Sequence, residues 1–410
     1  MLTIKHLRQR IRDTNAQQQI VDVLKLSVKP EDLVDFATDE EIVSAFTQAS
    51  IDSESLRSVL HSYPFPDFQR LGIYTGDGNP IYSLAGGFYS AVSISRLASE
   101  HGLPIENAKR VLDFGCGTSR ILRYFQEFLP VPHYFGTEVF GENVDWGRVA
   151  FPRVTYIHQS RLPPLIIDDE YFDLIYAYSI FSHFDEPTHK AWLEELEKKL
   201  APGGLMIVTI QSDVLLKRVA TESELRTRVG MDAIATVAAA RDYDRNGFAF
   251  RPIYDDAELS RGGLDATTFG LSFISLDYMK EHWTDRFEIL SYLPGAISEF
   301  QDWVVLKKLN RKGLVEKEKA AFLKPDRCHS DVLKLAISDE CLGSSLQTSR
   351  HIAELARAAN DRLAHIRTLE KQIQELTQTS NDRLAHIRKL EEKIEAAAQT
   401  NSVHHAPMHE

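Results

Sequence analysis

The chain has few cysteines and no long apolar run. Only Cys116, Cys328 and Cys341 occur in 410 residues, and a sparse, odd number argues against a disulfide framework. No apolar stretch approaches the roughly 20 residues that span a bilayer. The charged N-terminus also lacks the apolar core of a secretory signal. These absences favour a soluble, cytoplasmic protein without a transmembrane segment.

Metal-ligand spacing and excess positive charge are lacking as well. Cys328 is followed by His329, but no second pair completes a zinc-binding pattern, so we predict no metal site. The formal net charge is −12, which disfavours nucleic acid as a partner because phosphate backbones attract basic surfaces. The length leaves room for two or three structural units.

The most informative segment is Val-Leu-Asp-Phe-Gly-Cys-Gly-Thr at residues 111–118. A short apolar strand meets a turn at Gly115 and Gly117, where glycines let the backbone come close to a bound group. Asp113 beside this turn would repel a pyrophosphate but suits a cationic ligand. A second carboxylate, Glu138, lies 21 residues after Gly117, where an α/β fold places an acceptor for ribose hydroxyls.

Two later segments complete a recognisable order. Phe-Asp-Leu-Ile-Tyr-Ala-Tyr-Ser covers residues 172–179, and Leu-Ala-Pro-Gly-Gly-Leu-Met-Ile-Val covers residues 200–208. With the glycine turn and Glu138, they resemble the motifs of class I S-adenosylmethionine-dependent methyltransferases over residues 81–308. Ser119 stands where the family has a third glycine, a variation that the family tolerates. The alternative is a Rossmann-like domain whose turn only joins strand to helix.

The resemblance implies a fold, a cofactor and a set of contacts. The fold is α/β, a Rossmann-like, seven-stranded, mostly parallel sheet with an antiparallel last strand, and the cofactor is S-adenosyl-L-methionine. The residues that match the family's cofactor positions are Asp113, Gly115, Cys116, Gly117, Thr118, Glu138, Val139, Ser160 and Tyr178. Cys116 is also expected to pack as a small side chain. Adenine is expected near the loop of residues 158–161.

The loop after the fourth strand, residues 179–186, lies at the reactive rim of such a fold. A sulfonium is already an activated methyl donor, so the protein has to bind it, align an acceptor and exclude water. A sugar hydroxyl benefits from a general base, and His183 is the candidate for that catalytic role. The alternative is a structural histidine that orders the loop. Asp185 and Glu186 are expected to cap the helix that Pro187 begins.

Periodicity and turn residues divide the chain into five stretches. These are an N-terminal helical region (1–62), the methyltransferase domain (63–310) with a substrate-side insertion (213–270), a linker (311–345), a coiled coil (346–400) and a disordered tail (401–410). Strands are predicted at 110–114, 133–139, 154–158, 174–178, 205–210, 287–292 and 303–307, and helices at 188–200, 215–240 and 276–283. Residues 242–247 are predicted to form a polar loop.

A helix before the glycine strand carries three aromatic side chains, Tyr82, Phe88 and Tyr89. In methyltransferases this leading segment often covers the cofactor. The three aromatic rings are therefore expected either to cover the active site or to pack in the core.

The C-terminal region repeats isoleucine and leucine every seven residues over 352–397. Isoleucine at the first core position with leucine at the second favours a parallel two-stranded coil. An eight-residue segment at 360–367 recurs at 381–388, three heptads later, and so keeps the apolar seam on one face. Arginines at core positions leave a trimer open, and a single exposed helix is the alternative. The coil predicts a homo-oligomer or a coiled-coil partner protein.

These observations predict an enzyme that moves a methyl group from S-adenosylmethionine to an acceptor. The linked coil resembles the architecture of bacterial methyltransferases of surface-polysaccharide assembly, which suggests a sugar hydroxyl. A small molecule or a protein is the alternative acceptor. A catalytically weak methyltransferase-fold scaffold that assembles partners through its coil is the alternative from a different class.

Overall fold

The computed structural model describes residues 1–26, 28–35, 37–66, 80–130, 132–252 and 267–310, without the side chains of Ile81 and Tyr82. The predicted linker, coiled coil and tail lie outside these residues. The oligomer and the coiled-coil partner therefore stay predictions. The expected role of the Tyr82 ring also lies outside the described residues.

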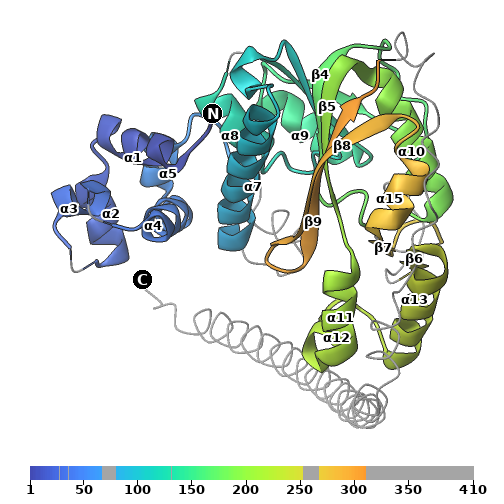
Figure 1. Cartoon of the computed structure of the whole chain (residues 1–410). Helices are drawn as coiled ribbons and strands as arrows, with labels where there is room; N and C mark the ends of the chain where they lie inside the picture. The colour runs from blue at the N-terminus through green and yellow to red at the C-terminus, as the bar shows by residue number, and fades with distance from the viewer. Residues whose placement is uncertain (27, 36, 67–79, 131, 253–266, 311–410) are drawn as a thin grey trace, which may run out of the picture. The chain divides into compact units, whose positions relative to one another are not determined.

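A seven-stranded sheet with strand order β3-β2-β1-β4-β5-β9-β8 forms the centre of the fold (Figure 1). Its strands are β1 (Arg110–Phe114), β2 (His133–Glu138), β3 (Thr155–His158), β4 (Phe172–Ala177), β5 (Leu200–Ile210), β8 (Phe287–Ile297) and β9 (Gln301–Lys308). The last strand, β9, runs antiparallel to both of its neighbours, and the pairs among β1 to β5 are parallel. The predicted α/β sheet with an antiparallel last strand is confirmed.

Helices cover both faces of this sheet, because strands such as β1 and β4 are apolar on both sides. One face packs against α7 (Pro80–Glu100), α8 (Leu122–Phe128) and α9 (Gly141–Ala150). The other face packs against α10 (Glu186–Lys199) and α15 (Leu276–His282). A short 3-10 helix, η1 (Ile105–Asn107), precedes β1. The result is a three-layer arrangement with its apolar cores on the two sides of the sheet.

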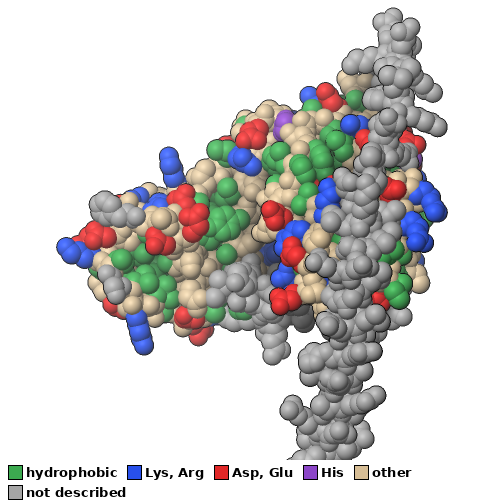
Figure 2. All heavy atoms as spheres, turned by 60° about the horizontal axis from the view of Figure 1, so that its bottom comes forward, with side chains coloured by type: hydrophobic (Ala, Val, Ile, Leu, Met, Phe, Trp, Pro, Cys, Tyr) green, Lys and Arg blue, Asp and Glu red, His purple; other side chains and the backbone are tan. Residues whose placement is uncertain are grey.

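The parallel strands all end at one edge of the sheet, which we call the carboxyl edge. It carries the ends of β1 to β5 and, because β9 is antiparallel, the beginning of β9 at Gln301. The opposite, amino edge carries the beginnings of the parallel strands and the end of β9 at Lys308. In Figure 1, β5 runs down to α11, so the carboxyl edge faces the bottom, which Figure 2 brings forward. Ligands of open α/β sheets bind at the carboxyl edge.

The N-terminal region is helical, as its periodicity predicts. Its helices are α1 (Ile4–Asp13), α2 (Gln17–Leu24), α3 (Pro30–Asp35), α4 (Asp39–Asp52) and α5 (Glu54–Leu60). The Thr38 hydroxyl accepts from the Glu41 N–H while the Glu41 carboxylate accepts from the Thr38 N–H, a capping box that starts α4. The Leu2 N–H donates to the Ser95 hydroxyl of α7 at 2.8 Å, so this region packs directly on the domain.

The aromatic residues of α7 divide between the core and the surface. Phe88 is fully buried and meets the Tyr124 ring edge-on at 5.3 Å. Tyr89 is partly exposed, and the negative charges of Asp39 and Glu40 add to burial in raising its pKa. Phe88 therefore packs in the core, and Tyr89 lies near the N-terminal helices.

The insertion after β5 differs from the predicted single helix over 215–240. It forms α11 (Asp213–Thr221), α12 (Ser223–Arg228) and α13 (Ala233–Asn246). The first break falls at Glu222, whose backbone is extended, and the second at Gly230, whose φ is +73°. Side chains of Ser212 and Asp232 cap α11 and α13. The predicted loop at 242–247 is also wrong, because α13 continues through it to a left-handed Gly247.

Two strands were not predicted, one within the insertion and one directly after it. β6 (Phe248–Arg251) and β7 (Leu271–Ile274) pair antiparallel in a separate two-stranded sheet. This sheet and the helices α11 to α13 share an apolar core of their own, which includes Leu216, Tyr243 and Phe273. The insertion is thus a folded subdomain attached at the carboxyl edge. Within the described ranges, no helix is long and apolar enough to cross a membrane.

Candidate functional site

The turn after β1 brings the backbone of two strands into contact. Gly115 and Gly117 have φ values of +75° and +52°, a region that glycine adopts without strain. A Cβ added at Gly115 would lie 2.3 Å from the Ile180 side chain, whereas one at Gly117 would meet no heavy atom within 4 Å. The turn is therefore closely packed on the β4 side and open above Gly117.

Ser119 fills the position of the third glycine without losing the turn. Its φ is +61°, so the residue adopts the left-handed conformation that a glycine would take. Its buried hydroxyl forms a 2.7 Å hydrogen bond with the Tyr156 hydroxyl. This bond helps to hold a strained backbone in place.

Glu138 lies at the end of β2 and is almost fully buried. One carboxylate oxygen accepts the Gly117 N–H at 2.7 Å, and the other accepts the N–H groups of Val139 and Phe140 at 2.8 and 3.0 Å. Burial raises the pKa of Glu138, and these three backbone bonds oppose the rise. A carboxylate has about four acceptor sites, so Glu138 retains capacity for a ligand hydroxyl beside the open space above Gly117.

Asp113 is buried at the end of β1. Burial raises its pKa to about 8, the Tyr176 hydroxyl and the Arg120 guanidinium oppose that rise, and Glu138 adds to it. The side chains around Asp113 therefore supply too little positive charge to keep its carboxyl ionised at neutral pH. A cationic ligand held above the turn would supply that charge. Glu138 as a hydroxyl acceptor, beside Asp113 as a carboxyl that a cation would ionise, fits the ribose and the sulfonium of S-adenosylmethionine.

The remaining predicted cofactor residues surround this turn in different ways. Cys116 is buried, and its thiol fills the space above Gly136, where an added Cβ would lie 2.9 Å from the sulfur. Thr118 is also buried, whereas Ser160 is exposed beyond β3. The Val139 carbonyl accepts from His158 Nε2 at 2.9 Å when that nitrogen carries the proton. The packing role predicted for Cys116 is confirmed, and the cofactor contacts stay predictions.

Tyr178 and His183 both lie in the loop that follows β4. Tyr178 is half-buried and packs against Trp303 of β9, with 5.6 Å between the ring centroids. The His183 ring stacks on Phe269 at 5.2 Å, and its Nδ1 lies 2.7 Å from the Gly270 carbonyl. Because a carbonyl only accepts, Nδ1 carries the proton and Nε2 presents a lone pair. Burial lowers the pKa of His183 below its ordinary value of 6.5.

Two residues that were not predicted as site residues, Ser179 and Gln301, lie next to His183 Nε2 and behind it. The Ser179 hydroxyl lies 3.4 Å from Nε2 and accepts a 2.8 Å hydrogen bond from the Gln301 side-chain amide. Ser179 has a φ of +60°, held by a 2.7 Å bond from its N–H to the Thr209 hydroxyl. Gln301 lies 122 residues from Ser179 in the sequence, so only the antiparallel position of β9 brings them together.

Neutral polar atoms collect at this same edge. The Ser182 hydroxyl and both polar atoms of the Gln211 side chain are buried, and neither residue forms a side-chain hydrogen bond within the described part of the chain. Native proteins seldom leave such groups unpaired. On the face that Figure 2 shows, Lys and Arg side chains are mixed with Asp and Glu.

The predicted cap of α10 is confirmed for one carboxylate. The Asp185 side chain accepts from the Thr188 N–H at 3.1 Å. Glu186 instead accepts from the Tyr278 hydroxyl at 2.9 Å and pairs with Lys190 at 2.7 Å. The loop that carries His183 is thus anchored at its end by α10.

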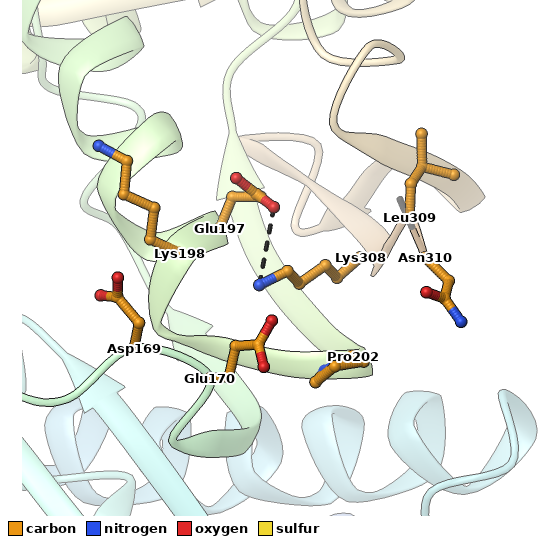
Figure 3. A pocket seen from close by; sticks show the side chains of 8 residues that line it. All are labelled: Asp169, Glu170, Glu197, Lys198, Pro202, Lys308, Leu309 and Asn310. Atoms are coloured by element: carbon orange, nitrogen blue, oxygen red, sulfur yellow. Dashed lines mark ion pairs between the residues drawn. The ribbon is translucent and has the colours of Figure 1, made fainter. Parts of the chain in front are cut away.

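A pocket of about 510 Å³ lies at the amino edge, away from all of these residues. Figure 3 shows its lining: Asp169, Glu170, Glu197, Lys198, Pro202, Lys308, Leu309 and Asn310. The Lys308 ammonium pairs with Glu197 at 3.7 Å and donates to the Leu200 carbonyl at 2.7 Å. Its Lys308 and Glu197 are paired with each other, and none of the predicted site residues lines it. In the part of the chain that the structure describes, no group of three His, Cys, Asp or Glu could hold a metal ion.

The strand order, the open glycine turn and the carboxylate at the end of β2 together define a class I S-adenosylmethionine-dependent methyltransferase domain. Residues 112–206 match the family model described as a methyltransferase domain. That match covers β1 through most of β5, the part of the sheet that holds the glycine turn, Glu138 and the His183 loop.

Individual relatives are distant. An uncharacterised protein of Rickettsia prowazekii (strain Madrid E), RP028, is 26% identical over 121 residues, which cover 28% of this chain and 48% of that protein. The chain thus matches about half the length of this curated relative.

Two solved methyltransferases illustrate the structural comparison. CalS10 of Micromonospora echinaspora, an amino pentose methyltransferase with bound S-adenosylmethionine, is 14% identical with a TM-score of 0.36, covering 58% of this chain and 95% of its own. NodS of Bradyrhizobium japonicum, an N-methyltransferase with S-adenosylhomocysteine, is 12% identical with a TM-score of 0.33, covering 54% and 87%. At these scores neither structure carries an argument about the substrate.

Proposed function

We propose that this protein transfers the methyl group of S-adenosylmethionine to a hydroxyl group of an uncharged acceptor. The observation that supports this most is His183, a neutral imidazole whose Nε2 lone pair lies at the carboxyl edge. The bound cofactor supplies an electrophilic methyl group on a sulfonium. An uncharged hydroxyl is a poor nucleophile, and it gains most from a base placed beside it.

The chain's own residues divide the work at this edge. Glu138 accepts a hydrogen bond from a ribose hydroxyl, and the glycine turn lets the cofactor lie close to the backbone. Asp113 favours positive charge above the turn, because a nearby cation would stabilise its buried carboxylate form. Gly115 packs against Ile180, which joins the cofactor turn to the loop that carries His183.

His183 receives the proton of the acceptor hydroxyl at Nε2 while its Nδ1–H stays bonded to the Gly270 carbonyl. The Ser179 hydroxyl lies 3.4 Å from Nε2. It either relays the proton from the acceptor hydroxyl to Nε2 or forms a hydrogen bond with the acceptor oxygen. Gln301 holds Ser179 in place by donating to its oxygen. Stacking on Phe269 fixes the plane of the imidazole ring.

The acceptor that these surroundings favour is rich in hydroxyl groups. Ser179, Ser182, Gln211 and Gln301 are all neutral hydrogen-bonding residues near His183 or at the end of β5. Such residues bind sugar hydroxyls without requiring a charge on the ligand. A sugar hydroxyl, as in bacterial surface-polysaccharide assembly, is the acceptor that we propose, with the enzyme acting in the cytoplasm.

Two measurements test this function in order. Calorimetric titration of the whole chain with S-adenosylmethionine should give saturable binding. Release of S-adenosylhomocysteine should then be followed with neutral sugars, amines and carboxylic acids as acceptors. We expect the neutral sugars to be preferred. Saturable binding with turnover only on amines or carboxylates would refute the hydroxyl acceptor, and binding without turnover on any acceptor would favour a scaffold.

A further inference from the structure

Arg120 carries a positive charge at the turn, and no acidic side chain among the described residues lies at contact distance from it. It follows the glycine turn directly and is half-buried. Its guanidinium carbon lies 5.0 Å from the centre of the Tyr178 ring. On the α7 side, a Cβ added at Gly86 would lie 3.9 Å from its Nη1. The guanidinium thus lies between the loop after β4 and α7.

A guanidinium has five N–H donors, and those of Arg120 form no hydrogen bond or salt bridge with a described residue. Arg123, one helical turn further on, donates to the Pro64 carbonyl. Arg286 at the amino edge pairs with Glu194 at 3.3 Å. Arg120 does act on Asp113, whose pKa it helps to lower, but the two do not approach to salt-bridge distance. Its donors therefore remain available for an anion.

The strand order indicates which part of the cofactor would reach this cation. The sheet order places β1 between β2 and β4. Glu138 lies at the end of β2, and Arg120 with Tyr178 lies on the β1 and β4 side of the turn. A cofactor held by its ribose at Glu138 and crossing the turn toward β4 carries its amino-acid end into the neighbourhood of Arg120.

We propose that Arg120 binds the α-carboxylate of the methionine part of S-adenosylmethionine, with the Tyr178 ring holding the guanidinium plane. The inference rests on the proposed cofactor, and it adds a residue that fixes the direction of that cofactor in the site. Arginine suits this role because its planar fork bonds both carboxylate oxygens at once. The cation–π contact with Tyr178 favours this position of the guanidinium before the ligand arrives.

The test compares two ligands that differ only in that carboxylate. Calorimetry should measure the dissociation constants of S-adenosylmethionine and decarboxylated S-adenosylmethionine for the full chain and for Arg120→Met. We expect the substitution to weaken S-adenosylmethionine by roughly 10- to 150-fold, the usual effect of a hydrogen bond between charged groups. Binding of the decarboxylated ligand should change by less than about threefold.

A matched control exists at the other end of the same strands. Arg110 lies over Tyr171 at 4.1 Å and donates to the Tyr171 carbonyl at 3.5 Å, at the amino edge. Arg110→Met should leave both dissociation constants unchanged. Arg120→Lys keeps the charge but not the fork, so it should restore part of the lost affinity.

Equal weakening of both ligands by Arg120→Met would show a structural role and overturn the assignment, as would no weakening of either. If Arg120→Met fails to give the circular dichroism spectrum of the folded protein, Arg120→Lys decides alone. It must then weaken S-adenosylmethionine more than the decarboxylated ligand. Failure of the unchanged protein to bind either ligand would instead refute the proposed cofactor.

Discussion

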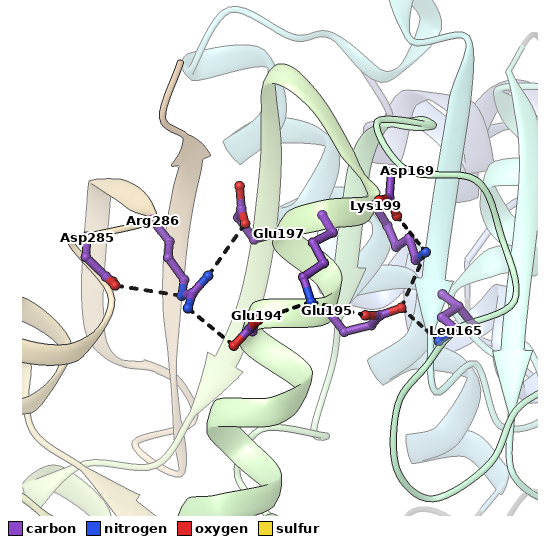
Figure 4. A network of polar contacts seen from close by, with 9 residues as sticks. Leu165, Asp169, Glu194, Glu195, Glu197, Lys199, Asp285 and Arg286 are labelled. Carbon is purple, nitrogen blue, oxygen red and sulfur yellow. Dashed lines mark hydrogen bonds and ion pairs between the residues drawn. The ribbon is translucent and has the colours of Figure 1, made fainter. Parts of the chain in front are cut away.

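The two edges of the central sheet are built from the same strands, yet they differ in how completely their polar and charged side chains are paired. At the amino edge, the Glu195 carboxylate accepts from the Leu165 N–H at 2.9 Å and pairs with Lys199 at 3.4 Å (Figure 4). Arg286 lies between Glu194 and Glu197 in the same network. At the carboxyl edge, buried Gln211 and half-buried Arg120 lack such partners among the described residues.

This difference separates groups that stabilise the fold from groups that await a ligand. Opposite charges at close range satisfy one another at the amino edge, so the pocket there offers a ligand little. Uncompensated burial at the carboxyl edge raises the pKa of Asp113 to about 8. Perturbed groups of this kind gather at functional sites. Substitutions at the two edges should therefore affect different measurements.

The largest effect is expected from His183→Ala at the carboxyl edge. Loss of a positioned base should reduce turnover by roughly 100- to 10,000-fold, while the dissociation constant of S-adenosylmethionine stays unchanged. Only the neutral imidazole accepts a proton, and its pKa lies below 6.5. The wild-type rate should therefore stay level near pH 7 and fall in more acidic buffer. A His183→Gln enzyme with wild-type turnover and pH profile would favour the structural alternative.

The corresponding substitution at the amino edge, Glu195→Ala, should affect stability instead. It removes a buried carboxylate, which leaves the Leu165 N–H without its acceptor, while Lys199 keeps its 2.8 Å pair with Asp169. We expect the free energy of unfolding to fall by about 1–3 kcal/mol, measured by urea denaturation. Asp145→Ala, which breaks an exposed pair with Arg148, should cost under about 1 kcal/mol. Weakened cofactor binding in folded Glu195→Ala would break the contrast between the edges.

Glu138→Ala should reduce cofactor affinity by about 1.5–3 kcal/mol, because the charge-assisted bond to a ribose hydroxyl is lost. The Gly117 N–H also loses its acceptor, so a smaller loss of stability should accompany the change. Titration of the folded variant with S-adenosylmethionine measures the first effect, and urea denaturation measures the second. Unchanged affinity would remove Glu138 from the site.

The smallest effect is a dependence of binding on pH through Asp113. A cationic ligand favours the ionised carboxylate, so binding below pH 8 expels a proton and affinity rises with pH by up to about tenfold per unit. At pH 7 the release should reach at most about 0.9 proton, given a pKa of about 8. Calorimetry in buffers of different ionisation enthalpy measures this release. Asp113→Asn should abolish it, and a release that persisted in that variant would assign the proton to another group.

The same carboxyl should act on stability in the opposite sense. In the free protein Asp113 holds a proton that the unfolded chain, with an ordinary pKa of 3.8, has already released. The folded state therefore loses stability as pH rises from about 4 to about 8, and the loss levels off above that range.

The sequence predicts the site where its residues are close together in the chain. The strand, the glycine turn and Glu138 follow within 29 residues, and their spacing is set by one β-α-β unit. Apolar runs with glycine and proline between them likewise predict β1 to β5. These features depend on residues close together in the chain, so the sequence pattern alone predicts them.

The sequence does not predict partnerships across the fold. Gln301 reaches Ser179 only because β9 pairs with β5. Nothing near Arg120 in the sequence reveals that its charge has no ion-pair partner among the residues that the structure describes. The breaks in the insertion were missed for a different reason. Most of residues 215–240 favour a helix, and the prediction of a single helix overlooks two signals inside the segment, Gly230 with a positive φ and the Asp232 cap. β6 and β7 are only four residues each, too short for a clear alternation.

The pairing of β5 with β9 also sets the order in which the chain can fold on the ribosome. β5 ends at Ile210 and its partner begins at Gln301. At about 5–20 residues per second, the 90 residues between these positions take about 5–20 s to synthesise. During that time β5 is the edge strand of the parallel sheet. Its unpaired backbone groups can form hydrogen bonds with a strand of another chain. The insertion, with a core of its own, is made in the same interval and can condense beside that edge, so a fragment that stops before residue 301 should be more prone to aggregate than the full chain.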